Sequence, residues 1–240
     1  MSLSNHPARF GWLLLCLVAL LLGGCTTIGA HDEAALKNTD FGPPESLRIC
    51  VLLDTPEISQ AEGAKLMQAV QTEFALYGIT VTVPWYHAWQ RPGFGRMKII
   101  TDLAARKLPP PCDRVMALVG QNAGDVLVGL FVTTEGSVDT VTHTRGYVVS
   151  EFSSINQVFM PPEAAMVHES YHLLGCDHDV TMTACYARIQ RLKAAARVNR
   201  AAGNDFFPTY TVRGQLIMNR DEVDVREANA LRVYLAKPKN

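Results

Sequence analysis

Three histidines and one glutamate are spaced so that they could act together on a metal ion. They lie in the run HESYHLLGCDH, which begins at His168. His172 follows four residues later, so a helix would project both imidazoles from one face, close enough to share an ion. Glu169 could then reach a water on that ion, and Gly175 could turn the chain so that His178 returns to it. Three neutral imidazoles leave a fourth position open, as a catalytic zinc site requires.

The fixed positions of this run, His-Glu-x-x-His-x-x-Gly-x-x-His, resemble the full zinc signature of the metzincin metallopeptidases. The resemblance implies one catalytic zinc ion bound by His168, His172 and His178. It implies that Glu169 acts as general base on a zinc-bound water that attacks a peptide carbonyl. The protein is therefore expected to be a zinc-dependent endopeptidase.

Metzincins also carry a methionine in a tight turn beneath the metal. Met218, in the run Leu-Ile-Met-Asn, fits this turn better than Met182, because the chain needs length to return under the metal. Met182 remains the alternative. Some metzincins place a tyrosine two residues after this methionine, but here the position holds Arg220, and Tyr210 is a weak substitute.

The resemblance implies an α/β (α+β) fold with a twisted, mixed, five-stranded sheet, a backing helix and an active-site helix. A smaller, mostly helical or irregular C-terminal subdomain would complete it. Apolar runs predict strands at 48–53, 79–83, 114–119, 126–132 and 146–150, and helices at 59–77, 161–174, 183–198 and 221–235. The catalytic domain is expected to span 47–240, with an upper part to residue 175 and a lower part from 176. Substrate would lie along a strand edge supplied by 146–150 or 126–132.

The beginning of the chain has the features of an export signal. A basic start precedes an apolar run, 10–22, that is too short to span a bilayer comfortably. The run ends in Leu-Gly-Gly-Cys, which resembles a bacterial lipobox and implies removal of residues 1–24 and lipidation of Cys25. Residues 25–46 would form a polar tether. Because Thr26 is not aspartate, the outer membrane is favoured over the inner, with the domain in the periplasm or at the cell surface. A plain signal peptide or a retained apolar anchor is the alternative.

Four cysteines remain after such processing, and an even number in an exported protein predicts two disulfides. Cys50 begins one predicted strand and Cys112 precedes another, so the two would be close if these strands are parallel neighbours. Cys176 and Cys185 flank the segment that carries His178. We therefore expect the pairs Cys50–Cys112 and Cys176–Cys185. The alternative, cysteine ligation of a metal, would be expected to show a Cys-x-x-Cys pair, which the sequence lacks.

The composition of the chain indicates which classes of binding partner to expect. A formal net charge of −1 gives no indication of nucleic-acid binding, so a peptide or protein substrate, the membrane and a monomeric state are expected. A zinc amidase that acts on cell-wall peptides is one alternative function. A non-catalytic lipoprotein with structural zinc is another, with Asp177 or Asp179 as fourth ligand, although either could instead orient an imidazole. His31, His87 and His143 have no partner spacing and are expected to be ordinary surface residues.

Overall fold

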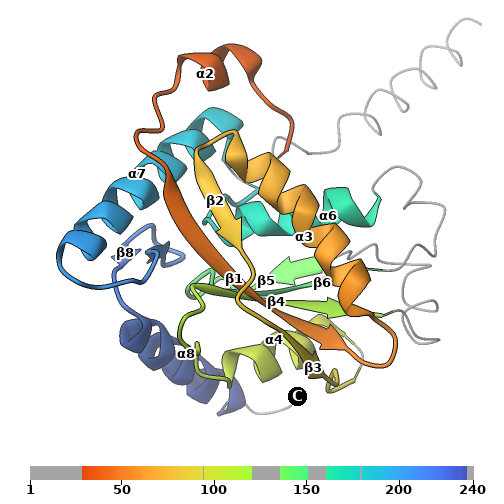
Figure 1. Ribbon diagram of the computed structural model, residues 1–240. Helices are drawn as coiled ribbons and strands as arrows, with labels where there is room; N and C mark the ends of the chain where they lie inside the picture. Colours follow the sequence, from red (N-terminus) through yellow and green to blue (C-terminus); the bar gives the residue numbers. More distant parts are fainter. Residues whose placement is uncertain (1–28, 94, 121–135, 151–160, 179, 237–240) are drawn as a thin grey trace, which may run out of the picture.

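A mostly parallel sheet with helices on both faces gives the protein a mixed α/β fold (Figure 1). The computed structural model describes residues 29–93, 95–120, 136–150, 161–178 and 180–236. The export signal, Cys25 and the strand predicted at 126–132 fall outside these ranges. The predicted α/β class, a mixed sheet backed by helices, is confirmed.

The main sheet has the strand order β2-β1-β4-β6-β5, and β3 also pairs with β1. The bounds are β1 Glu45–Asp54, β2 Ile79–Thr82, β3 Tyr86–Trp89, β4 Arg114–Val119, β5 Gly136–Val138 and β6 Arg145–Val149. β2 pairs with the first half of β1 and β3 with its second half, so the sheet contains six strands, one more than predicted, in five adjacent positions. All of these pairs are parallel except β5 with β6, which makes β5 the antiparallel strand next to β6.

The helices are α2 Glu33–Asn38, α3 Gln60–Ala75, α4 Arg96–Ala104, α6 Pro162–His172, α7 Met182–Ala201 and α8 Arg220–Leu235, and a small sheet pairs β7 Thr209–Tyr210 with β8 Leu216–Ile217. A capping box starts α3, because Ser59 and Glu62 each accept the other's backbone N–H. Gly78, with φ of +63°, then turns the chain into β2. Among the described residues, no helix combines the length and the apolar character that a membrane crossing needs.

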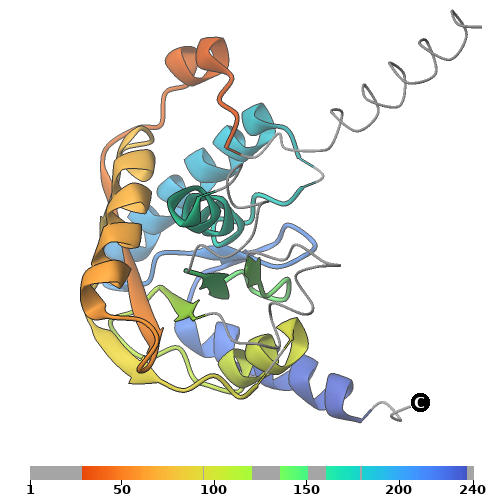
Figure 2. The same ribbon diagram turned by 90° about the vertical axis from the view of Figure 1, so that its right-hand side faces the viewer.

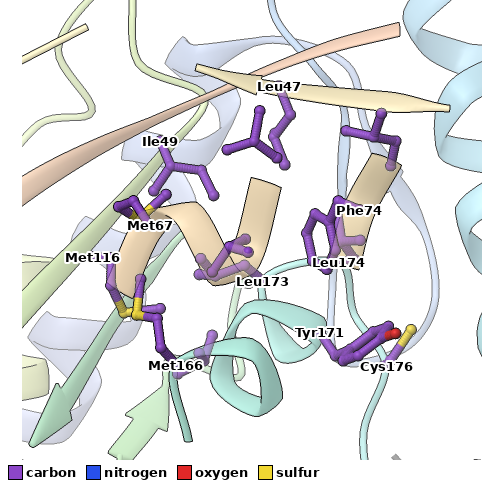
Figure 3. Packing of buried hydrophobic residues seen from close by; sticks show 14 of the residues in the cluster. Leu47, Ile49, Met67, Phe74, Met116, Met166, Tyr171, Leu173, Leu174 and Cys176 are labelled. Atoms are coloured by element: carbon purple, nitrogen blue, oxygen red, sulfur yellow. The ribbon is translucent and has the colours of Figure 1, made fainter. Parts of the chain in front are cut away.

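Successive residues of β1 point to opposite sides of the sheet, and each side has its own apolar core. Ile49 and Val51 belong to a core shared with α3, α6 and α7, whereas Cys50 and Leu52 belong to a core shared with α4 and α8. Figure 3 shows the first core, with Phe74 of α3 among its side chains. Each large apolar side chain buried in this way contributes about 1.5–3 kcal/mol. In Figure 2, α6 lies on one side of β5 and β6, and α4 and α8 lie on the other.

The segment before β1 packs against the domain, whereas the sequence predicted a polar tether there. His31 Nε2 lies 3.0 Å from Glu73 Oε1 of α3, and His31 is half-buried rather than an ordinary surface residue. The Phe41 ring packs against the rings of Tyr77 and Tyr186, with centroid distances of 5.1 and 5.8 Å. The described part of the predicted tether, residues 29–44, is therefore attached to the domain through His31 and Phe41, although most of its residues are polar.

The C-terminal helix is attached to the turn between β5 and β6 through two buried carboxyl groups. Glu227 of α8 is 1 % exposed, accepts a hydrogen bond from the Thr142 hydroxyl at 2.5 Å and is hydrogen-bonded to the Asp139 side chain. Burial, followed by the charge of Asp139, raises the pKa of Glu227 to about 9. At neutral pH Glu227 is therefore protonated and donates a hydrogen bond to Asp139.

We expect the free energy of unfolding to fall as pH rises from the ordinary glutamate pKa of 4.5 towards 9. Over this interval folded Glu227 keeps a proton that the unfolded chain releases, so stability decreases with pH. Glu227→Gln should remove this contribution, because an amide cannot ionise but can still donate to Asp139. Urea unfolding at pH 5 and pH 9 measures the difference, and equal pH slopes for the variant and the wild type would contradict it.

Candidate metal centre

The last two turns of α6 carry three of the four predicted site residues. The helix begins after Pro161, whose neighbour Pro162 is tolerated in the first turn. Its apolar residues Ala165 and Met166 face the first core. Gly175 adopts φ of +74°, so the chain leaves the helix sharply, as the sequence predicted.

The bend after α6 brings the three predicted histidines together. One nitrogen from each imidazole of His168, His172 and His178 lies within 4.8 Å of the other two. The Nε2 atoms of His168 and His172 are 3.2 Å apart. Two nitrogens that share a tetrahedral zinc ion are about 3.3 Å apart, given zinc–nitrogen bonds of about 2.0–2.1 Å. The donor set therefore fits zinc, and no movement of α6 is needed to bring the first pair to it.

The protonation state of His172 also suits metal binding. Its Nδ1–H donates to the carbonyl of Cys176 at 2.6 Å, which leaves the Nε2 lone pair directed towards the other imidazoles. Burial, and then the neighbouring His168, lower the pKa of His172 to about 4. The ring is therefore neutral at physiological pH, as a metal ligand must be.

Glu169 lies against the backbone of β5. Its side chain is buried, and a Cβ added to Gly136 would stand 2.5 Å from Glu169 Cγ and 2.7 Å from the carbonyl oxygen of Tyr147. Only glycine allows this approach without a shift of one of the two elements. No sequence pattern indicates Gly136, because β5 is too short for alternation to be visible.

The edge strand beside α6 differs from the prediction. The region 146–150 was one expected edge, but β6 is paired with β4 on one side and with β5 on the other. β5 is the outer strand in the described part of the sheet. The prediction is wrong for 146–150, because β6 has a further partner, a three-residue strand that no sequence pattern indicated. The alternative edge, 126–132, falls outside the described residues.

The segment after Gly175 is held by residues from distant parts of the chain. Asp177 accepts from His143 Nε2 at 3.3 Å and from Arg188 at 3.4 Å. His143 is 2 % exposed, so its predicted place on the surface is wrong. Among the described residues, the group that could hold a metal ion comprises the three histidines and does not include Asp177. Asp179, the other predicted fourth ligand, falls outside the described residues.

Both disulfides join the pairs that the sequence favours. Cys50 of β1 is joined to Cys112, which lies just before β4. Cys176 and Cys185 are joined across the segment that carries His178. All four residues are fully buried. The second bridge fixes the start of α7 to the residue whose carbonyl orients His172.

Arg114, which no sequence motif indicates, stabilises the end of α6. It is fully buried at the start of β4, and its guanidinium donates to the carbonyls of Leu173, Phe207 and Pro208 at 2.7–3.2 Å. Arginine can serve several acceptors at once because its donors form a planar fork. Arg114 thus ties the C-cap of α6 to the strand β7 that follows Pro208.

The residues proposed for a turn beneath the metal lie in different places. Met218 follows β8, and its carbonyl accepts from the side chains of Asn199 and Asn204. Met182 starts α7 and is buried in the first core. The role of Met218 stays a prediction. Tyr210 packs against Gly175, and its hydroxyl donates to the carbonyl of Arg188, which assigns it a structural contact.

Comparison with known proteins adds a fold similarity. No protein-family model matches the sequence, and no curated protein matches it. Among solved structures, the chain is similar to archaemetzincin from Methanopyrus kandleri, with 12% sequence identity and a TM-score of 0.39. The match covers 61% of this chain and 86% of that chain. At this TM-score the similarity supports no conclusion about function, which depends on the residues of the site.

Proposed function

We propose that the protein is a zinc-dependent peptidase. The observation that supports this most directly is the convergence of His168, His172 and His178, whose nitrogens lie within 4.8 Å of one another. Glu169 stands next to the first of these ligands on the same helix and is not part of the ligand group. A structural zinc site would have no use for a carboxylate in this position, whereas a hydrolytic site needs one.

In this proposal the three imidazoles hold the ion and Glu169 handles the proton. Zinc bound there would act as a Lewis acid towards water and a peptide carbonyl. Glu169 accepts the proton of the attacking water and then delivers it to the leaving amine. His172 stays neutral and correctly turned because the Cys176 carbonyl binds its other ring nitrogen.

The proposed substrate is an extended peptide that pairs with β5. An outer strand offers backbone N–H and C=O groups to a further strand, which gives affinity without a demand for particular side chains. Gly136 of β5 lies directly against Glu169, so a peptide on this edge would pass beside the general base. The same contact would position the scissile bond for the three-histidine site.

The test is zinc analysis of the full chain together with cleavage of a peptide library. We expect one zinc per chain, loss of the metal in His172→Ala, and cleavage that stops with a chelator and returns with added zinc. Bound zinc without cleavage of any peptide or cell-wall peptide would favour a structural metal. Cleavage restricted to cell-wall peptides would favour the amidase. A chain that binds no zinc would refute the proposal.

A further inference from the structure

We propose that His143 is the positioning residue for the third metal ligand, which it holds in place through Asp177. The inference rests on the proposed function, because it concerns the same metal centre. His143 lies in the turn between β5 and β6, far in sequence from His178. It has no direct part in the proposed reaction. It acts on the site through the loop that follows α6.

The need for such a residue arises from where the ligands sit. His168 and His172 are fixed by the hydrogen bonds and the buried face of α6. His178 lies beyond the helix, after a left-handed glycine, and its side chain is exposed. The position of a metal ligand on such a bend is therefore only as well defined as the conformation of the bend.

Asp177 is the point at which the bend is held. One carboxylate oxygen accepts from His143 Nε2 at 3.3 Å, and the other accepts from Arg188 at 3.4 Å. Arg188 also donates to the carbonyl of Gly175, the residue that makes the turn. The carboxylate next to His178 is therefore bound from two sides, by the turn between β5 and β6 and by α7.

His143 is itself rigidly placed. Its other ring nitrogen, Nδ1, donates to the Tyr210 carbonyl at 2.9 Å. Its backbone has φ of +54°, a conformation that costs a residue other than glycine roughly 1–2 kcal/mol. Asp139 offsets this cost by accepting the backbone N–H groups of Val141, Thr142, Thr144 and Arg145, which closes the turn around His143.

Both partners of the ring are acceptors, so the ring is best suited to donate from both nitrogens. Burial lowers the pKa of His143, but the hydrogen bonds to Asp177 and Tyr210 and the charge of Asp139 outweigh it and raise the pKa above its ordinary value. A doubly protonated imidazole satisfies the carbonyl and the carboxylate together. No other side chain of similar size offers two donors at this separation.

A matched pair of variants separates positioning from general stability. The amide of Asn can take the place of Nδ1, and the amide of Gln can take the place of Nε2. His143→Asn therefore keeps the bond to Tyr210 and loses the bond to Asp177, whereas His143→Gln does the reverse. Asn tolerates the left-handed backbone better than Gln, so stability alone would favour His143→Asn.

The first measurement is hydrogen exchange of the metal-free full chain, read in the peptide that contains Cys176 to His178. We expect faster exchange in His143→Asn and wild-type exchange in His143→Gln, although the Asn variant is the more stable by urea unfolding. The second is zinc affinity by competition with a fluorescent chelator. We expect it to fall roughly 10–100-fold in His143→Asn, the range for residues that orient ligands, and to change much less in His143→Gln.

The outcomes distinguish this inference from the proposed function. Unchanged exchange near Asp177 in His143→Asn, or an exchange order that follows the stability of the two variants, would overturn the role of His143. A wild-type chain that binds no zinc would refute the proposed function, while the exchange result would still decide whether His143 holds the bend.

Discussion

Replacing Glu169 by glutamine is expected to slow peptide cleavage by roughly 10²–10⁴-fold and to leave zinc bound. The three nitrogens that could hold the ion belong to other residues, so in the proposed mechanism the variant loses only the group that would accept the proton. A positioned general acid–base contributes roughly 10²–10⁴-fold to rate, which sets the expected fall in kcat/KM. Glutamine has nearly the same size, so the contact with Gly136 is retained. The measurement is kcat/KM on the best library peptide, with zinc content measured on the same preparation.

Glu163→Gln is the matched control for this result. Glu163 belongs to the first turn of the same helix and forms an ion pair with Lys65 of α3 at 2.7 Å. Its loss removes a solvent-screened ion pair at the surface and should leave kcat/KM close to that of the wild type. A Glu169→Gln enzyme as active as this control would refute the assigned role.

Gly136→Ala is expected to remove most of the activity by moving Glu169. The new methyl carbon would stand 2.5 Å from Glu169 Cγ and 2.7 Å from the Tyr147 carbonyl oxygen, distances at which something must shift. A misplacement of about 1 Å at a reacting group can cost roughly 100-fold in rate. Zinc affinity should be unchanged, because the atoms nearest to the new methyl group belong to Glu169 and Tyr147 and not to a histidine. Steady-state kinetics and zinc titration on the same variant check both expectations.

Gly146→Ala is the control for this result. It strains the same two strands, β5 and β6, at a position that is not in contact with Glu169. Its methyl carbon would meet Val138 of β5 at 2.8 Å, and the two residues are paired in the β5–β6 ladder. Both alanine variants should lose stability, by about 1–3 kcal/mol, because both overpack a buried position. Only Gly136→Ala should lose roughly 100-fold in kcat/KM. Equal activity losses in the two variants would show that the hairpin as a whole, and not the contact with Glu169, is responsible.

The parts of the site that depend on local geometry were predictable from the sequence. Helical spacing places His168 beside His172, and a left-handed glycine returns His178 to them, because each relation spans only a few residues. The two disulfides followed from strand order and from the same short segment. The α/β class followed from the order of apolar runs.

The residues that support the site could not be predicted, because their partners are distant in sequence. His143 meets Asp177 and Tyr210 only after the sheet, α6 and β7 have assembled. Gly136 belongs to a strand of three residues, which is too short to show a period, so the edge was predicted at 146–150 or 126–132 and not at β5. Phe41 attaches the segment before β1 by packing against the rings of Tyr77 and Tyr186, a contact that composition does not reveal.

The Cys176–Cys185 bridge has a consequence for how the protein matures. Closing a loop of this length restricts the disordered chain by about 2–3 kcal/mol at 25 °C in the chain-entropy description. Before thiol oxidation, an incoming metal ion would itself have to supply the ordering of the segment around His178. Metal loading should therefore be easier after the bridge has formed, which sets an order of events: oxidation first, zinc second. A newly made chain held in a reducing compartment would then take up the proposed metal less readily than the oxidised chain.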